Sequence, residues 1–191
     1  MTSVPRPLNS CTNYEYVYNL IVEDIEDNST CGIVNSNGRV GFANIKNSCF
    51  TNSVLQSLLH TPVLAELYAN GAIKKNINEI NNNSTKGILT AWLCGIANCY
   101  WSSKYCLINT VEIMNVLSSQ LGNQFDGYSP QFAFQFQDIL LNKLAEDVNE
   151  INYPEYDFTP YLDGPITTWA MDYNARKNRY MRSIIHILIK S

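Results

Sequence analysis

A cysteine lies where the sequence turns from a loop into a helix. The stretch 41–62 reads GFANIKNSCFTNSVLQSLLHTP, with Cys49 near its middle and Asn44 five residues earlier. A thiol acts as a nucleophile in its thiolate form, and the free N–H groups at a helix N-terminus favour that anion. An asparagine on the preceding loop is a suitable donor to the oxyanion of acyl transfer. These residues predict a thiol nucleophile at Cys49; the plain alternative is a small buried cysteine at a helix start.

Thiol hydrolases need a base within hydrogen-bond reach of the cysteine, and the chain has two histidines. His60 lies eleven residues beyond Cys49, about 16 Å along the same helix, so we expect it to be structural. His186, in RSIIHILIKS, is the remaining candidate base. Its apolar surroundings are typical of a strand histidine without a catalytic role, and we favour that second interpretation.

The spacing of apolar residues predicts helices around this cysteine. One covers residues 50–60 and ends at Thr61-Pro62, because proline disfavours helix at the residue before it. Others are expected in TPVLAELYANG, in the buried stretch GILTAWLCGIANCYW, in NTVEIMNVLSSQLG with Asn109 or Thr110 as its cap, and in QFAFQFQDILLNKLAEDVNE. Residues 72–86 read as a polar surface loop, 126–130 as a turn and 1–40 as irregular or strand-like.

The composition excludes several classes of function. The chain of 191 residues has a net charge of -4, and its basic cluster near Arg179 is typical of a solvated face, so we expect no nucleic-acid partner. The six cysteines form no C-x-x-C pair, which argues against a zinc site, and we expect neither metal nor cofactor. No signal peptide or spanning apolar run is visible, so we expect no membrane association and a cytoplasmic or nuclear location.

The stretch around Cys49 resembles the cysteine box of the ubiquitin-specific proteases, roughly G-L-x-N-x-G-N-T-C-Y-M-N-S-x-L-Q-x-L. The shared residues are Gly41, Asn44, Asn47, Cys49, Asn52, Ser53, Leu55, Gln56, Leu58 and Pro62. Ser48 replaces the family's threonine, Phe50 its tyrosine and Lys46 its glycine. The resemblance implies that Cys49 is the nucleophile and Asn44 the oxyanion donor.

A second stretch, FDGYSPQFAFQFQDILLNKL, resembles the glutamine-rich helix of the same family, roughly Q-Q-D-A-x-E-F-L-x-x-L-L-x-x-L after F-x-G-Y. Matching residues are Phe125, Gly127, Tyr128, Gln131, Ala133, Phe136, Leu140, Leu141 and Leu144. The resemblance implies an α+β, mostly helical chain: the thumb of a papain-like cysteine protease, with the fingers and most of the palm missing. We divide it into residues 1–40, a helical thumb-like core at 41–148, and a C-terminal segment at 149–191 as a possible palm remnant.

This chain also departs from the family pattern. The family's glutamine-rich helix carries an acidic pair that faces arginines in the tail of ubiquitin, and here those positions are Phe132 and Gln135. Gln131 and Gln135 are the expected substrate-binding residues. The family's G-H-Y-type histidine motif is not found.

The resemblance implies a deubiquitinase that cleaves isopeptide or peptide bonds after the ubiquitin C-terminus, with ubiquitin or a ubiquitin-like protein as partner. Two alternatives stay open. One is an inactive relative that serves as a binding or scaffold subunit of a larger complex. The other is a protease for a ubiquitin-like modifier, which the changes at Phe132 and Gln135 would suit.

Overall fold

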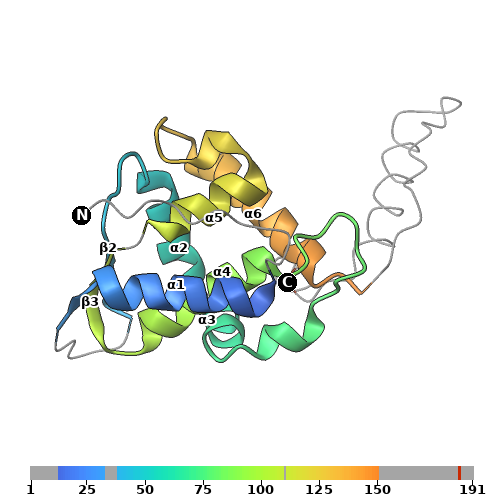
Figure 1. Cartoon of the computed structure of the whole chain (residues 1–191), viewed down its shortest axis with the longest axis horizontal. Coiled ribbons are helices and arrows are strands. Elements are labelled where there is room, and N and C mark those ends of the chain that lie inside the picture. Colours follow the sequence, from blue (N-terminus) through green and yellow to red (C-terminus); the bar gives the residue numbers. More distant parts are fainter. Residues whose placement is uncertain (1–12, 33–37, 110, 151–184, 186–191) are drawn as a thin grey trace, which may run out of the picture.

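A computed structural model describes residues 13–32, 38–109, 111–150 and Ile185 of the chain. Helices dominate these residues, and a small sheet lies at one end (Figure 1). In chain order the elements are α1 (Tyr14–Asn28), β1 (Thr30–Cys31), β2 (Gly41–Phe42), α2 (Cys49–Leu59), α3 (Pro62–Ala69), the 3-10 helix η1 (Ala72–Asn76), α4 (Ile88–Trp101), β3 (Tyr105–Ile108), α5 (Glu112–Leu121), the 3-10 helix η2 (Asn123–Phe125) and α6 (Ala133–Asp147).

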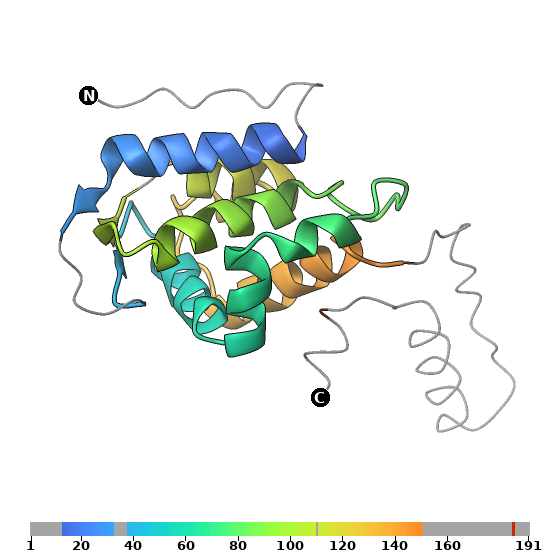
Figure 2. The same cartoon turned by 90° about the horizontal axis from the view of Figure 1, so that it is seen from below.

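Helix α4 is the centre of the core. It contacts α1, α3, α5 and α6, and Figure 2 shows it between α1 and the α2–α3 pair. Apolar residues cover nearly its whole circumference, and Leu89, Trp92 and Ile96 are fully buried. The buried Trp92 indole donates its Nε1 hydrogen to the carbonyl of Ile113 at 3.2 Å. The predicted buried helix is therefore confirmed.

The N-terminal segment corrects the sequence analysis, since residues 14–28 form a helix and not an irregular or strand-like stretch. Tyrosine and valine favour strands, but Val17, Ile21 and Ile25 recur every four residues and are fully buried. Helix α1 lies along α4, where Gly95 lets Ile21 approach closely (Figure 2).

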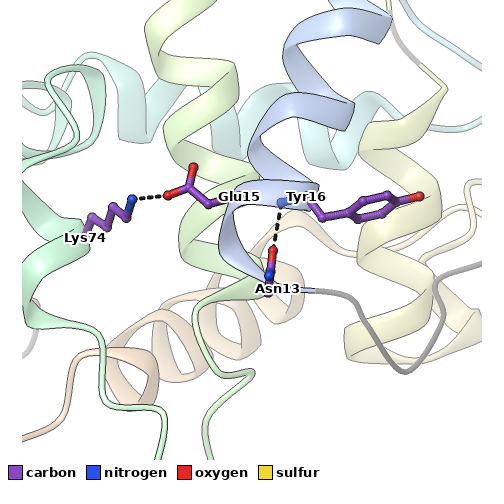
Figure 3. Close-up of polar contacts among 4 residues, drawn as sticks. All are labelled: Asn13, Glu15, Tyr16 and Lys74. Atoms are coloured by element: carbon purple, nitrogen blue, oxygen red, sulfur yellow. Dashed lines mark hydrogen bonds and ion pairs between the residues drawn. The ribbon is translucent and has the colours of Figure 1, made fainter.

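Polar contacts hold the first turn of α1 (Figure 3). Asn13 is its N-cap, and its Oδ1 accepts a hydrogen bond from the Tyr16 N–H at 3.0 Å. Glu15 forms an ion pair with Lys74 of η1. Both contacts lie on the surface, so the burial of the apolar face against α4 contributes most to holding this helix.

The apolar stripes predict that α2, through Val54, Leu55, Leu58 and Leu59, packs against the helix face of Phe132, Phe136 and Leu140, and helices α2 and α6 do pack together. The ring centroids of Phe50 in α2 and Phe136 in α6 are 5.2 Å apart. Leu140 and Leu144 of α6 are also buried. The prediction is wrong for Phe132, which precedes α6 as its N-cap and is 76% exposed. Helix α2 ends at Leu59, and Pro62 begins α3, as the Thr61-Pro62 sequence indicates.

Residues 72–86 differ from the expected polar surface loop. They begin with η1, and Asn81 and Thr85 are buried beside the end of α6. The fully buried Asp147 carboxylate accepts hydrogen bonds from the N–H and hydroxyl of Thr85 and of Thr90, at distances between 2.6 and 3.2 Å. Burial raises the pKa of Asp147, although these hydrogen bonds oppose that shift. Polar residues of this loop therefore donate hydrogen bonds to a buried carboxylate.

Other predictions concern the second half of the chain. The helix expected in 109–122 is present as α5, but its N-cap is Val111 and no side chain caps it, so the expected cap at Asn109 is wrong. Thr110 and His186 lie outside the described residues, as does the segment 149–191 except Asn149, Glu150 and Ile185. Within the described part of the chain, no helix is both long and apolar enough to cross a membrane.

The three strands form one sheet in the order β1-β3-β2. Strand β1 pairs antiparallel and β2 parallel with β3, and Phe42 lies opposite Ile108. The Ala43 N–H extends this pairing by donating to the Ile108 carbonyl at 2.8 Å. The sheet thus fixes the chain immediately before Asn44.

Candidate active site

Cys49 is the first residue of α2 and is exposed to solvent. The preceding residue, Ser48, is the helix N-cap, but its side chain makes no capping bond to the helix. The first backbone N–H groups of α2 therefore stay free of side-chain acceptors, and the positive end of the helix dipole lies at the thiol.

The Asn44 side chain is held against the first turn of α2 by Ser48. The Ser48 hydroxyl donates to Asn44 Oδ1 at 3.2 Å and accepts the Ile45 N–H at 2.9 Å, and Ser48 is only 3% exposed. Because Oδ1 accepts this bond, the Nδ2 hydrogens of Asn44 are left to donate elsewhere. An amide N–H donor stabilises an oxyanion when the oxyanion forms within hydrogen-bond reach of it.

Helix α2 also holds the strand that leads to Asn44. Asn52 donates its Nδ2 hydrogen to the Ala43 carbonyl at 3.1 Å, and Gln56 donates to the Val40 carbonyl at 2.9 Å. The two residues are one helical turn apart, so a single polar edge of α2 runs along residues 40–43. This pairing fixes the spacing between the nucleophile helix and the asparagine loop.

The loop before Cys49 is attached on its other side to the turn at residues 126–128. The Asn47 backbone N–H and its Nδ2 donate to the Gly127 and Tyr128 carbonyls, both at 2.8 Å. Gly127 has φ +79°, a conformation that favours glycine. Lys46, where the family has glycine, adopts φ +57°, and its ammonium lies 3.4 Å from the centroid of the Tyr128 ring. A left-handed backbone at position 46 explains why glycine suits it.

Helices α2 and α6 run in the same direction. Phe50, near the start of α2, contacts Phe136, near the start of α6, whereas the ends of both helices line a common apolar groove. That groove is lined by Leu58, Leu59, Leu64, Ala65, Tyr68, Leu93, Leu141, Leu144 and Ile185. Two helix N-termini therefore lie at the end of the molecule that holds Cys49.

The expected substrate-binding glutamines lie at this same end. Gln131 is half-buried just before α6, and Gln135 is exposed in its first turn. Their role in binding stays a prediction.

His60 has a structural role, as expected. Its Nδ1 faces the Gln56 carbonyl at 2.8 Å, its Nε2 faces the Gly38 carbonyl at 3.1 Å, and its ring packs edge-on against Tyr100. It lies at the end of α2 opposite Cys49. The other histidine, His186, lies outside the described residues, whereas its neighbour Ile185 is buried in the groove at the end of α2 away from the thiol.

The other cysteines of the described residues differ in environment. Cys94 and Cys99 are buried in α4, where burial raises the pKa of each thiol to about 11. Cys31 and Cys106 are exposed on β1 and β3 and not at a helix start. In the same part of the chain, no group of three or more histidine, cysteine, aspartate or glutamate residues could hold a metal ion.

The sequence predicts roles for Cys49 and Asn44, which stay predictions, but it does not indicate the contacts of Ser48. A serine one residue before a helix is typical of an ordinary N-cap. In the structure, however, its hydroxyl donates to Asn44 Oδ1 and accepts from the Ile45 N–H. The four-residue spacing of Asn44 and Ser48 was a usable signal, because a chain that turns into a helix brings such residues together.

Comparison with known proteins identifies the family of this chain. The family model described as ubiquitin carboxyl-terminal hydrolase matches residues 40–190. The chain belongs to this family. Its mostly helical structure with a small sheet is that of part of a papain-like ubiquitin-specific protease.

Two relatives give the extent of the similarity. Ubiquitin carboxyl-terminal hydrolase 19 of Homo sapiens is 31% identical over 127 residues, which are 66% of this chain and 10% of the relative. Ubiquitin carboxyl-terminal hydrolase 15 of Xenopus tropicalis is 30% identical over 127 residues, or 13% of its length. The chain thus spans a small part of each of these two relatives.

Proposed function

We propose that this chain carries the nucleophile of a deubiquitinase-type thiol hydrolase. Its substrate is an isopeptide or peptide bond after the C-terminus of ubiquitin or a ubiquitin-like protein. Family membership supports this proposal, and the observation that carries it is the hydrogen bond from Ser48 to Asn44 Oδ1 at 3.2 Å. That bond joins Asn44 to the N-cap of the helix that begins with the exposed Cys49, which supports a role for the Asn44 amide as the oxyanion donor.

In the proposed reaction the Cys49 thiolate attacks the carbonyl carbon of the substrate's C-terminal residue. A C–S bond forms, and the carbonyl oxygen becomes an oxyanion that accepts a hydrogen bond from Asn44 Nδ2. Collapse of the oxyanion breaks the C–N bond, and the leaving amine takes up a proton. Water then hydrolyses the thioester, which releases the carboxylate and the free thiol.

General-base help typically contributes about 100- to 10,000-fold to the rate of such reactions. Among the described residues, no histidine lies beside Cys49, since His60 is bound at the far end of α2. We therefore expect the isolated 191-residue chain to react at Cys49 but to fail to turn over a ubiquitin C-terminal amide reporter. Reporter cleavage lost in both Cys49→Ala and His186→Ala would show that His186 is the base.

The proposal is tested with ubiquitin that carries an alkyne trap in place of its C-terminal carboxylate. Because the trap reacts irreversibly, even a weakly held ubiquitin accumulates as a thioether adduct. We expect intact-mass analysis to find one ubiquitin per chain, attached at Cys49 and lost in Cys49→Ala. If no adduct forms while a small alkylating reagent still labels Cys49, the non-catalytic binding or scaffold role is favoured instead.

A further inference from the structure

The segment between Asn44 and Cys49 is a single tight turn of four residues. The Ile45 N–H donates to the Ser48 hydroxyl at 2.9 Å, and the Ser48 N–H donates to the Ile45 carbonyl at 3.2 Å. Ile45 and Ser48 are the outer residues of this turn. Because the turn links the asparagine directly to the cysteine, the backbone conformation of its two central residues sets the orientation of the Asn44 side chain relative to the first turn of α2.

The first central residue of this turn is Lys46, whose backbone lies in the left-handed region at φ +57°. Turn positions with positive φ favour glycine, because a Cβ crowds the backbone in this conformation. The cysteine box of the ubiquitin-specific proteases has glycine at this place. A lysine at the same place therefore needs contacts that hold it in the left-handed conformation.

Contacts with the turn at 126–128 hold Lys46 in this conformation. Its ammonium lies 3.4 Å from the centroid of the Tyr128 ring, which is a cation–π contact. Among the described residues Lys46 makes no ion pair, so the ring is the partner of its charge. The second central residue, Asn47, donates its backbone N–H and an Nδ2 hydrogen to the Gly127 and Tyr128 carbonyls, both at 2.8 Å. Both central residues are thus bound to the same neighbouring turn.

We propose that Lys46 is a positioning residue, which orients the Asn44 amide toward the reacting carbonyl through its contact with the Tyr128 ring. This inference rests on the proposed function, in which Asn44 is the oxyanion donor and Cys49 the nucleophile. Glycine adopts positive φ without strain, but it gives the turn more conformations and offers no side chain to the ring. Lysine at position 46 replaces that freedom with one fixed conformation.

Binding of the peptide aldehyde acetyl-glycyl-glycinal to the full chain measures this positioning. The Cys49 sulfur adds to the aldehyde carbon, and the carbonyl oxygen takes up the thiol proton at the position of the oxyanion. The dissociation constant is obtained from the protection of Cys49 against iodoacetamide. Lys46→Met keeps a long side chain but removes the charge, so it should weaken aldehyde binding about threefold, the change in equilibrium constant that corresponds to an exposed cation–π contact.

Further variants assign the effect to the contact with the ring. Lys46→Arg keeps a cation over the ring and should bind the aldehyde like the wild type. Lys75→Met makes the same change at an exposed lysine of η1 and should leave binding unchanged. Lys46→Gly relieves the strain of the positive φ, so its midpoint in urea should be at least as high as that of Lys46→Met, although its aldehyde binding should be equally weak. A residue that merely stabilised the fold would not separate these two quantities.

The outcomes separate this inference from the proposed function. Alkylation by iodoacetamide uses no oxyanion donor, so its rate at Cys49 should be the same in Lys46→Met and in the wild type. Unchanged aldehyde binding in Lys46→Met, or an alkylation rate that falls in parallel with it, overturns the positioning role and leaves the proposed function standing. If Asn44→Ala binds the aldehyde as tightly as the wild type does, or if the wild type binds none while iodoacetamide still labels Cys49, both proposals fail.

Discussion

Replacing Ser48 by alanine should disable Asn44 without touching the thiol. Ser48 is 3% exposed, and its hydroxyl donates to Asn44 Oδ1 and accepts from the Ile45 N–H. Alanine removes both bonds, frees the Asn44 amide to rotate and leaves the Ile45 donor without this acceptor. Threonine keeps the hydroxyl and is the residue of the family motif, so Ser48→Thr is the matched control.

The magnitudes follow from these two bonds. Each is worth about 0.5–1.5 kcal/mol net, so Ser48→Ala should lower the free energy of unfolding by about 1–3 kcal/mol in a urea titration. Removing an oxyanion donor outright costs about 100- to 1,000-fold, which is the loss we expect for Asn44→Ala. Ser48→Ala removes only the bond that orients the Asn44 amide, so it should weaken the stabilisation of the oxyanion about tenfold, which is the equivalent of one hydrogen bond.

A peptide aldehyde measures this effect without any turnover. The Cys49 thiol adds to the aldehyde to form a hemithioacetal, whose oxygen occupies the oxyanion position. Its dissociation constant is obtained from the protection of Cys49 against iodoacetamide, a reaction that uses no oxyanion donor. We expect weaker aldehyde binding in Ser48→Ala, near wild-type binding in Ser48→Thr, and an unchanged alkylation rate in both. Unchanged aldehyde binding in Ser48→Ala, with a loss in Asn44→Ala, would refute the positioning role of Ser48.

Three further predictions concern the frame of the site. Ile21→Ala should cost about 2–5 kcal/mol in urea unfolding because Ile21 is fully buried against α4, whereas Tyr16→Ala on the exposed face should cost less than about 0.5 kcal/mol; equal effects would contradict the packing of α1. Gly127→Ala should cost more than Gly71→Ala, since both glycines have positive φ but only at Gly127 would a Cβ approach Met114, at 3.3 Å. Burial raises the pKa of Asp147 in the folded state, so the folded protein binds more protons than the unfolded chain does between the ordinary aspartate pKa and the elevated one. The free energy of unfolding should therefore fall as the pH rises through that range. Asp147→Asn should abolish this fall, and a slope that persists in the variant would contradict the prediction.

Periodicity and the two motifs predicted much of the fold. The helical spacing from Phe50 to Leu59 located α2, and the four-residue steps at Phe136, Leu140 and Leu144 located the buried face of α6. These patterns are reliable because burial of an apolar face selects both the residues and their spacing. The cysteine-box motif placed Cys49 at the start of α2 and Asn44 on the loop before it, and the catalytic roles of the two residues stay predictions.

The rest depended on contacts between distant residues. The tyrosines and valines of residues 14–28 favour strands, so the sequence alone did not predict helix α1. What stabilises this helix is its burial against α4 near Gly95, a contact between residues far apart in the sequence. The polar loop before α4 holds the Asp147 carboxylate, 62 residues beyond Thr85. Phe132 continues the apolar spacing of α6 but lies before its first turn, where no neighbour covers it. Local pattern does not encode such pairings.

Competitive labelling of the thiols tests the central claim, that the fold makes Cys49 a nucleophile. The full chain is treated with a substoichiometric amount of iodoacetamide at neutral pH, and labelling at Cys49 is compared by peptide mapping with that at Cys31 and Cys106. All three thiols are exposed, but only Cys49 begins a helix, and labelling of the urea-unfolded chain corrects for intrinsic differences. We expect Cys49 to label about tenfold faster than either of the others in the folded chain, with the difference lost on unfolding. Labelling of Cys49 no faster than that of Cys31 and Cys106 would contradict the account.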